Sequence, residues 1–400
     1  MRLMAARIGI FDHLSANRGG GQLVVARMAA ELARDFSVEV IHDGAGYRLG
    51  ELGEAFGLDL SRVRERIVRE LPRSFAVPGD RSFLSYVTEG LRFDRALTEP
   101  YALFVYSGHG VPPVSHAGAG MVYCHFPFEG APRADSDLPG RRYALDRWAR
   151  VRCYDWLWSR RMRSYRAVYA NSNFTASWIE RLWGTQSDVL YPPVAAPVRP
   201  GKKRNMIISI GRFDGRDRKN LGAQLRAFPQ FLAGVHEEWT LCMMGFCRDT
   251  LPDREQLDAL RQQAAGLPVT FLVNAERDTI LSALGEARMF WHTRGLDEAG
   301  EGPTPPRHME HFGIATVEAM MAGCVPFVPA NGGQLEIVEH GVSGMLCADT
   351  HALIDASIRL ASDPDSLRRM GQRARERSHA FRAGIFDHRV SEIARSLVRS

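Results

Sequence analysis

Residues 7–42 read RIGIFDHLSANRGGGQLVVARMAAELARDFSVEVIH, and this stretch decides the fold. Its pattern predicts a strand at Arg7–Phe11, a glycine-rich loop at Ser15–Gly21, a helix at Gln22–Arg34 and a second strand at Val38–His42. Strand, loop, helix and strand in this order form a βαβ unit, whose strands run parallel. The segment therefore predicts an α/β fold built on a parallel sheet.

The same pattern continues along the chain and is interrupted once. The stretch YPPVAAPVRPGKKR at Tyr191–Arg204 holds four prolines and a basic cluster, which indicates an extended connector. We expect two α/β domains, residues 1–195 and 203–384, with ligands in a cleft at the carboxyl ends of the strands. The other predicted strands are Leu103–Tyr106, Met121–His125, Ala167–Asn171, Ser187–Leu190, Asn205–Ile210, Trp239–Met244, Val269–Phe271, Met289–His292 and Val325–Pro329. Predicted helices of the second half are Leu221–Phe228 and Asp278–Leu284, and residues 365–400 are mostly helical in pattern.

Composition excludes several classes of protein. The 400 residues are 45% hydrophobic and 24% charged, which excludes a disordered, fibrous or membrane-embedded chain. Lys plus Arg is 51 and Asp plus Glu is 46, so the net charge of +5 is too mild for a dedicated nucleic-acid binder. The six cysteines show no C-x-x-C spacing, no signal peptide is apparent, and no run approaches the ~20 apolar residues of a membrane span. We expect a cytoplasmic protein whose membrane contact, if any, is peripheral.

Two loops follow the first strands of the two halves. Gly19–Gly21 lets the backbone approach a ligand at a helix start, where free N–H groups favour an anion, although a flexible turn explains it equally well. The second loop, SIGRFDGRDRKN at Ser209–Asn220, gathers basic residues that suit a diphosphate. A solvated basic loop is the alternative.

The most specific segment is EHFGIATVEAMMAGCVPFVPANGGQLEIVEHGVSGML at 310–346. We expect Glu310 before a helix at Thr316–Ala322 and Glu318 in its first turn. N–H groups near the helix start favour an anion, and a carboxylate such as Glu318 can accept two hydrogen bonds from a ribose diol. An ordinary helix with solvated glutamates has the same spacing.

With these motifs the chain resembles the retaining glycosyltransferases of family 4. The E-x7-E pattern stands as Glu310 and Glu318, and GRFDGRDRKN, NSNFTASWIERLWG and LYPPV resemble further family segments. The resemblance implies the GT-B architecture: an α/β fold of two facing Rossmann-like domains with parallel sheets and a cleft between them. It implies an acceptor-binding domain at 1–195, a donor-binding domain at 203–384, and a helix within 385–400 that packs back on the first domain.

The resemblance also implies roles for residues. Arg212 and Lys219, with Arg218 sharing the task, would bind the donor diphosphate and stabilise the leaving group. Glu310 would hydrogen-bond the transferred hexose, and Glu318 would bind the ribose. The remaining donor-binding positions are Gly20 and Gly21 in the N-terminal loop, and Phe312, Gly313, Ile314 and Ala315 around the phosphate and sugar.

The same resemblance bears on the roles of three histidines. The stretch YCHFP places His125 at a strand end, where it would face the anomeric carbon; a histidine satisfied within the fold is the alternative. His308 and His311 flank Glu310 but lack the carboxylates of a metal site, and the resemblance implies an enzyme without metal or other cofactor.

Residues 141–166 hold nine arginines, two aspartates and three tryptophans. Basic residues with tryptophan are typical of helices at a membrane surface, so this segment predicts contact with anionic lipid or a lipid-linked acceptor. A surface helix whose aromatic rings pack inward is the alternative.

The resulting hypothesis is transfer of a hexose from a nucleoside-diphosphate sugar to a glycan or lipid-linked acceptor, with retention of configuration. GDP-mannose is the favoured donor, because the HFGI, CHFP and NSNFT segments resemble mannosyltransferases. A UDP-sugar enzyme and a non-catalytic nucleotide- or glycan-binding protein of the same fold are the alternatives. A nicotinamide dehydrogenase is disfavoured, since G-x-G-x-x-G is missing.

Overall fold

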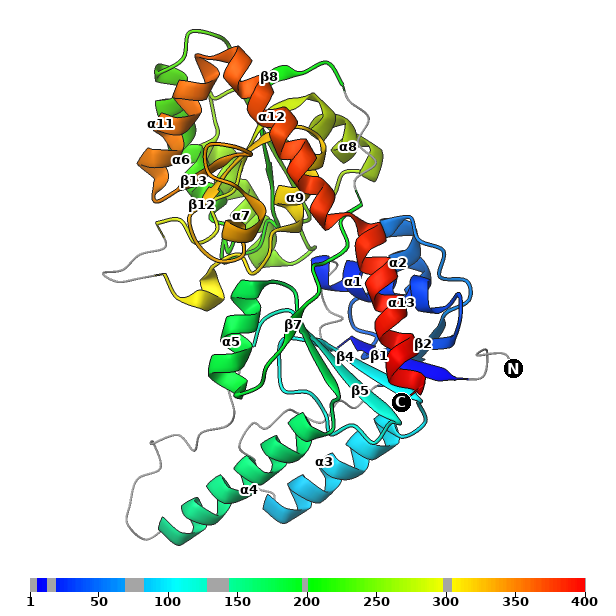
Figure 1. Cartoon of the computed structure of the whole chain (residues 1–400). Helices are drawn as coiled ribbons and strands as arrows, with labels where there is room; N and C mark the ends of the chain where they lie inside the picture. Colours follow the sequence, from blue (N-terminus) through cyan, green and yellow to red (C-terminus); the bar gives the residue numbers. More distant parts are fainter. Residues whose placement is uncertain are drawn as a thin grey trace. The chain divides into compact units, whose positions relative to one another are not determined.

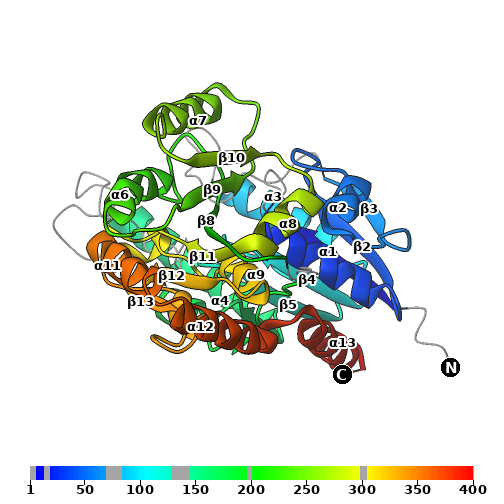
Figure 2. The same ribbon diagram turned by 90° about the horizontal axis from the view of Figure 1, so that it is seen from above.

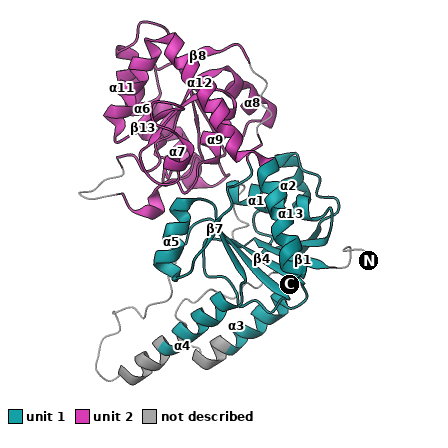
Figure 3. Ribbon diagram, in the orientation of Figure 1, with its two compact units in different colours: residues 1–193, 384–400 teal, residues 194–383 magenta. Residues whose placement is uncertain are grey.

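The computed structural model describes residues 6–12, 19–68, 83–127, 144–195, 201–297 and 304–399. The chain divides into two compact units, residues 1–193 with 384–400, and residues 194–383 (Figure 3). Each unit is an α/β structure with its own parallel sheet (Figure 1). The predicted connector is described at its two ends only, and there Val194 pairs with Arg382 of the same unit.

The first unit contains a seven-stranded sheet in the order β3-β2-β1-β4-β5-β6-β7, and every strand pairing that it shows is parallel. Strand β1 pairs with β2 on one side and with β4 on the other. Its strands are β1 (Arg7–Asp12), β2 (Ser37–His42), β3 (Arg64–Ile67), β4 (Leu103–Gly108), β5 (Ala119–Cys124), β6 (Ala167–Ala170) and β7 (Asp188–Val189). Its helices are α1 (Gly20–Leu32), α2 (Leu49–Phe56), α3 (Phe83–Thr98), α4 (Ala144–Arg163) and α5 (Asn173–Trp183).

Alternate residues of the central strands feed two cores. Along β4, Leu103 and Val105 pack with α1 and α2, whereas Phe104 and Tyr106 pack with α3, α4 and α5. Successive side chains of a strand point to opposite faces, so helices on both faces bury the sheet completely. This explains why the central strands appear as continuous apolar runs in the sequence.

The last helix, α13 (Ala383–Arg399), belongs largely to the first unit. Phe386, Val390 and Ala394 on one face enter the core shared by α1 and β1. The Arg27 guanidinium, on α1, donates two hydrogen bonds to the Asp387 carboxylate, at 2.8 and 2.6 Å. The end of the chain is therefore an integral layer of the first unit.

The second unit contains a six-stranded parallel sheet in the order β10-β9-β8-β11-β12-β13. Helices α6 and α11 lie side by side on one face (Figures 1 and 2), while α9 and α12 pack together on the other. Its strands are β8 (Arg204–Ile210), β9 (Thr240–Gly245), β10 (Val269–Val273), β11 (Ala287–Trp291), β12 (Val325–Pro329) and β13 (Met345–Cys347). Its α-helices are α6 (Leu221–Ala233), α7 (Leu251–Gln263), α8 (Arg277–Glu286), α9 (Ile314–Met321), α10 (Gln334–Ile337), α11 (Thr350–Ala361) and α12 (Pro364–Ser378), with short 3₁₀ helices at Pro306–His308 and His379–Phe381.

Aromatic rings fill the core of the second unit. Phe228, Phe231, Trp239 and Trp291 are all fully buried, and the Phe231 ring stands edge-on to both tryptophans. The Trp291 indole donates to the Ser357 hydroxyl at 3.0 Å, so its polar edge is satisfied inside the core. Among the described helices, none combines the length and the apolar character that crossing a membrane requires.

Candidate active site

The candidate site of the second unit lies where its strands end. Carboxyl ends of parallel strands meet at one edge of the sheet, and the loops that follow them gather there. A Cβ on Gly245 would stand 1.6 Å from the carbonyl oxygen of Gly211, so the loops after β8 and β9 are in direct backbone contact. Any side chain at position 245 would push these loops apart.

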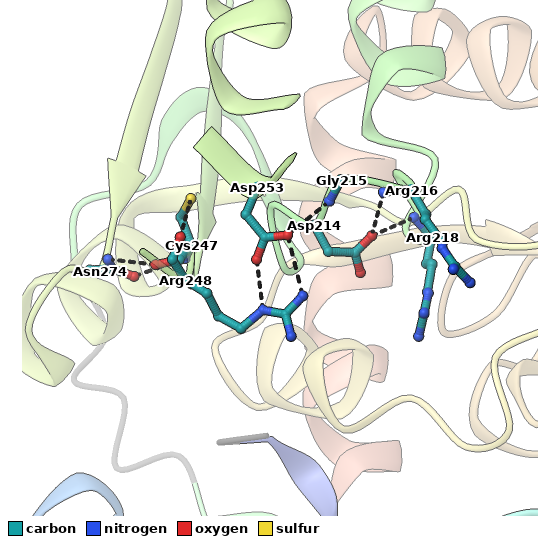
Figure 4. Close-up of polar contacts among 8 residues, drawn as sticks. All are labelled: Asp214, Gly215, Arg216, Arg218, Cys247, Arg248, Asp253 and Asn274. Atoms are coloured by element: carbon teal, nitrogen blue, oxygen red, sulfur yellow. Dashed lines mark hydrogen bonds and ion pairs between the residues drawn. The ribbon is translucent and has the colours of Figure 1, made fainter. Parts of the chain in front are cut away.

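Carboxylates shape the basic loop after β8. Asp214 Oδ1 accepts the backbone N–H groups of Arg216 and Arg218, both at 3.2 Å (Figure 4). Buried Asp253 accepts the N–H of Gly215 at 3.0 Å. These bonds fix the loop backbone, while the side chains of Arg216 and Arg218 are exposed.

The loops after β9 and β10 are tied in the same way (Figure 4). The Arg248 guanidinium donates to Asp253 at 2.7 Å. The Asn274 side chain accepts the N–H of Cys247 at 2.9 Å and donates to its carbonyl at 3.0 Å. Three consecutive strand-end loops thus form one hydrogen-bonded layer beside Arg212.

Lys219 and Glu310, predicted separately, meet as an ion pair. The Lys219 amine donates to Glu310 Oε2 at 2.6 Å, and their side chains are only 20% and 15% exposed. His292 Nε2 lies 3.2 Å from the same oxygen. Burial opposes the charge on Glu310, but Lys219 and His292 outweigh it and hold the pKa of this carboxyl well below its usual range. Glu310 is therefore a carboxylate at neutral pH.

Positive charge exceeds negative charge around this pair. Burial lowers the pKa of Arg212; Asp214 opposes this shift, and Arg218, Arg248 and Arg294 reinforce it. Burial likewise lowers the pKa of Lys219, against the pull of Glu310. A group of cations that depress one another's pKa favours a bound anion, which would relieve their mutual repulsion.

The segment after β11 supplies residues that the sequence patterns did not single out. His292 faces Glu310, and the Thr293 hydroxyl donates to the carbonyl of Asn220 at 2.8 Å while accepting from Gln224 at 2.9 Å. Arg294 donates to the carbonyls of Arg307 and His308, both at 3.1 Å. The one available signal was their position directly after a buried strand.

Gly313 caps helix α9 with a conformation that favours glycine. Its φ is +121°, and a Cβ there would lie 2.8 Å from Gln334 Nε2. The fully buried Gln334 amide and Thr316 hydroxyl make no hydrogen bond among the described residues. The turn into α9 therefore presents its first N–H groups beside two unsatisfied polar side chains.

The other predicted residues of this turn are placed as follows. The Phe312 ring is 3% exposed and stacks edge-on against Phe381 at 5.6 Å, so only its backbone is available to a donor. Ile314 and Ala315 form the first turn of α9 and are half-buried. The helix begins at Ile314, two residues earlier than predicted, because Gly313 already provides the turn.

Glu318 consequently lies in the second turn of α9, and its predicted place in the first turn is wrong. The side chain is half-buried. Burial raises the pKa of Glu318 to about 7, with Arg277 pulling it down. Its charge state therefore changes near neutral pH.

In the first unit the structure brings Gly21 and His125 together. Gly20 and Gly21 belong to the first turn of α1 rather than to the predicted loop, with Gly19 as the cap. A Cβ on Gly21 would lie 3.5 Å from His125 Nε2. His125 Nε2 is 3.0 Å from the Ser107 hydroxyl, and burial lowers the pKa of His125 to about 4. The imidazole is neutral at physiological pH and its ring is fixed by β4.

Among the described residues, no group of three or more His, Cys, Asp or Glu side chains could hold a metal ion. His311 is buried, and burial with Arg294 lowers its pKa to about 3. Its imidazole is neutral beside the carboxylate of Glu310.

The second unit matches a known protein family. Residues 195–377 match the family model described as "Glycosyl transferases group 1". The second unit therefore resembles a group 1 glycosyltransferase domain. Glu310, Glu318, Arg212 and Lys219 all lie within the matched segment, and the match supports a glycosyltransferase enzyme.

Curated relatives are mannosyltransferases. The chain is 27% identical over 254 residues to the GDP-Man:Man(3)GlcNAc(2)-PP-Dol alpha-1,2-mannosyltransferase of Dictyostelium discoideum, covering 58% of this chain and 47% of the relative. It is 28% identical over 305 residues to the alpha-1,3/1,6-mannosyltransferase ALG2 of Mus musculus, covering 70% of this chain and 68% of the relative. The chain thus spans about half the length of the first relative and two thirds of the second.

Solved structures match nearly the whole chain. HepE of Anabaena, in complex with UDP and glucose, superposes with a TM-score of 0.66 at 15% identity, over 98% of this chain and all of that one. A glycosyltransferase of Rickettsia africae gives a TM-score of 0.68 at 12% identity, over 99% of both chains. At such identity the likeness shows the fold alone: two α/β domains with parallel sheets, as in GT-B glycosyltransferases.

Proposed function

We propose that this protein transfers mannose from GDP-mannose to a hydroxyl of a glycan or lipid-linked acceptor, with retention of configuration and without a metal or other cofactor. The second unit would bind the donor and the first unit the acceptor. Support for mannose comes from the two mannosyltransferases named above, one of which carries GDP-Man in its name.

One observation carries the proposal: a carboxylate held ionised by a lysine, beside mutually repelling arginines. Glu310 accepts from Lys219 at 2.6 Å, and Arg212 and Arg294 act on the same group of charges. A nucleoside-diphosphate sugar is complementary to such a group. Its diphosphate takes the cations, and its hydroxyls donate to the carboxylate.

The chemistry follows from this arrangement. The bond between the anomeric carbon and the departing phosphate oxygen breaks, and Arg212 and Lys219 stabilise the charge that develops on the diphosphate. The acceptor oxygen bonds to the anomeric carbon on the same face. Its proton passes to the departing phosphate oxygen. The N–H groups of α9 that follow Gly313 add a fixed positive end beside the phosphate.

His125 would serve as a neutral hydrogen-bonding group in this reaction. Its pKa of about 4 leaves the ring neutral at pH 7, so it would orient a donor or acceptor hydroxyl rather than act as an imidazolium acid. Gly21 packs against its ring, and a Cβ there would lie 3.5 Å from His125 Nε2.

A UDP-sugar is the second candidate donor. HepE, which shares the fold over almost the whole chain, has been solved with UDP and glucose. The contacts proposed for Arg212, Lys219 and Glu310 are to a diphosphate and a sugar, which both donors contain.

The test is transfer of radiolabelled sugar to a glycan and lipid extract of the source cells. We expect label from GDP-mannose in the extract, with an α-linked product, and none when Arg212→Ala replaces the native protein. Transfer from UDP-glucose alone would overturn the mannose assignment. No transfer from any nucleotide sugar, with nucleotide still bound, would favour the non-catalytic alternative.

A further inference from the structure

Helix α4 ends in a cluster of arginine and tryptophan that the proposed reaction does not use. The side chains on its inward face have partners within the first unit. Trp158 is 8% exposed and its indole donates to the carbonyl of Trp183 at 3.3 Å, while buried Arg161 lies 3.9 Å from buried Asp94. The side chains on its outward face are exposed. Trp156 is 49% exposed, and the Arg160 guanidinium stands 5.5 Å from its ring centre.

These outward side chains line a surface pocket of about 250 Å³, which we call the α4 pocket. Its other wall is the loop that leads into β5. Its lining residues are Val114, Ser115, His116, Trp156, Arg160, Arg163 and Ser164.

The loop wall of the α4 pocket is rigidly held. The backbone N–H groups of Val114, Ser115 and His116 donate to three different side chains, at 2.8, 2.9 and 2.8 Å. Their acceptors are Asp94 and Thr98, on α3, and Ser164, at the end of α4. The pocket is thus preformed, so a ligand would not need to order it.

The charged residues that line the pocket are both arginines. Arg160 and Arg163 are exposed, and no described carboxylate pairs with either guanidinium. His116 Nε2 is buried and makes no hydrogen bond with a described residue. Two guanidinium groups and a neutral imidazole in one concave site fit the oxygens of a phosphate group.

The α4 pocket is remote from the proposed catalytic edge. It lies where β5 and β6 begin, whereas His125 follows the end of β5. A six-residue strand separates the two edges, a distance of roughly 20 Å. The pocket therefore needs a ligand of its own.

We propose that the α4 pocket binds the phosphate of an anionic phospholipid headgroup, with Trp156 lying in the interfacial layer beside it. The planar guanidinium group of arginine can donate two hydrogen bonds to one phosphate. An exposed tryptophan beside basic residues suits the boundary between headgroups and acyl chains. One pocket with room for a single headgroup, on a chain of net charge +5, argues against a nucleic-acid groove. This inference is independent of the sugar donor.

Sedimentation with vesicles tests the proposal. We expect the full chain to pellet with vesicles of phosphatidylcholine and phosphatidylglycerol at low salt, and not with phosphatidylcholine alone. Arg160→Gln with Arg163→Gln should weaken this binding by at least about tenfold, on the scale of two surface arginines at an anionic membrane. Soluble glycerol phosphate should compete with the vesicles, because the pocket recognises the phosphate itself.

Arg181 provides a matched control, since its guanidinium stacks over Trp178 at 5.1 Å on another helix of the same unit. Arg181→Gln should bind vesicles as the native protein does. A Trp156→Phe variant should lose the blue shift of tryptophan emission that vesicles produce. Three results would overturn the proposal. The double variant could bind vesicles as well as the native protein does, Arg181→Gln could weaken binding as much as the double variant does, or glycerol phosphate could fail to compete. Nucleotide-dependent stabilisation should survive in the double variant, which verifies its folding and separates this test from that of the proposed function.

Discussion

The Lys219 amine lies 2.6 Å from Glu310 Oε2, across 91 positions of sequence. The pair joins the loop after β8 to the turn before α9, the two segments on which the proposed donor site is built. Both partners are mostly buried. A bound nucleotide sugar would share this ion pair, with the diphosphate beside Lys219 and a sugar hydroxyl beside Glu310.

Replacing Arg212 or Lys219 by alanine should lower turnover by at least about tenfold, because each removes a charge-assisted contact to the leaving diphosphate. Steady-state rates with donor in excess measure this. Arg216→Ala is the control, since its exposed side chain lies on the same loop and its backbone alone bonds Asp214. Unchanged turnover in both Arg212→Ala and Lys219→Ala would contradict the assignment.

Glu310→Gln should keep the shape of the site and remove its negative charge. Lys219 then loses its ionised partner, and we expect a lower free energy of unfolding by about 1–3 kcal/mol, the scale of a hydrogen bond to a charged group. Turnover should fall further than this stability loss explains, because a neutral amide accepts a sugar hydroxyl less strongly. Denaturant unfolding and turnover, measured on the same preparation, separate the two effects. Full activity in Glu310→Gln would show that Glu310 takes no part in the reaction.

Donor affinity should rise with pH through the titration of Glu318. Its pKa, raised by burial to about 7, means that the carboxyl is protonated below pH 7 and ionised above it. Only the ionised form accepts from both ribose hydroxyls. Between pH 6 and pH 8 the ionised fraction grows about tenfold, and GDP-mannose affinity should tighten in proportion. Calorimetry at these two pH values tests this.

Glu318→Gln is the control for that measurement. Its affinity should be weak and nearly independent of pH over the same range. A native affinity that is flat between pH 6 and pH 8 would exclude Glu318 as the ribose ligand.

Gly313→Ala should destabilise the protein and weaken donor binding. The added Cβ would lie 2.8 Å from Gln334 Nε2 at a φ of +121°, and strain of this kind costs of order 1–3 kcal/mol. Thermal unfolding and nucleotide titration measure the two effects. Gly50→Ala in α2 is the matched control, because nothing lies within 4 Å of its Cβ position and helix propensity favours alanine there. If Gly313→Ala behaved like Gly50→Ala, the turn would not constrain the site.

The sequence predicted the strands that are buried on both faces. Of the four edge strands, it predicted β7 and β10 and missed β3 and β13. Strand β4 is apolar on both sides and its position was predicted. Strand β3 reads RERI and is half exposed, so it carries no apolar run that would mark it. Tertiary pairing with β2 makes it a strand.

The candidate site was predictable only in part, for a related reason. Motif segments indicated Arg212, Lys219 and Glu310, but His292 and Arg294 are brought to them by the neighbouring positions of β8 and β11. Sheet order is set by packing and cannot be derived from local spacing. Likewise, the Phe312 ring is buried because the segment after α12 returns to cover it with Phe381.

The most direct test of the account is thermal unfolding of the native protein with GDP, UDP, ADP and dTDP in turn. Saturating GDP should raise Tm more than the other nucleotides do, since a ligand at 100 times its Kd adds about 2.7 kcal/mol to the stability of the folded state. The rise should disappear in Arg212→Ala with Lys219→Ala. If no nucleoside diphosphate changes Tm, or if the double variant responds as the native protein does, this site does not bind a nucleotide-sugar donor.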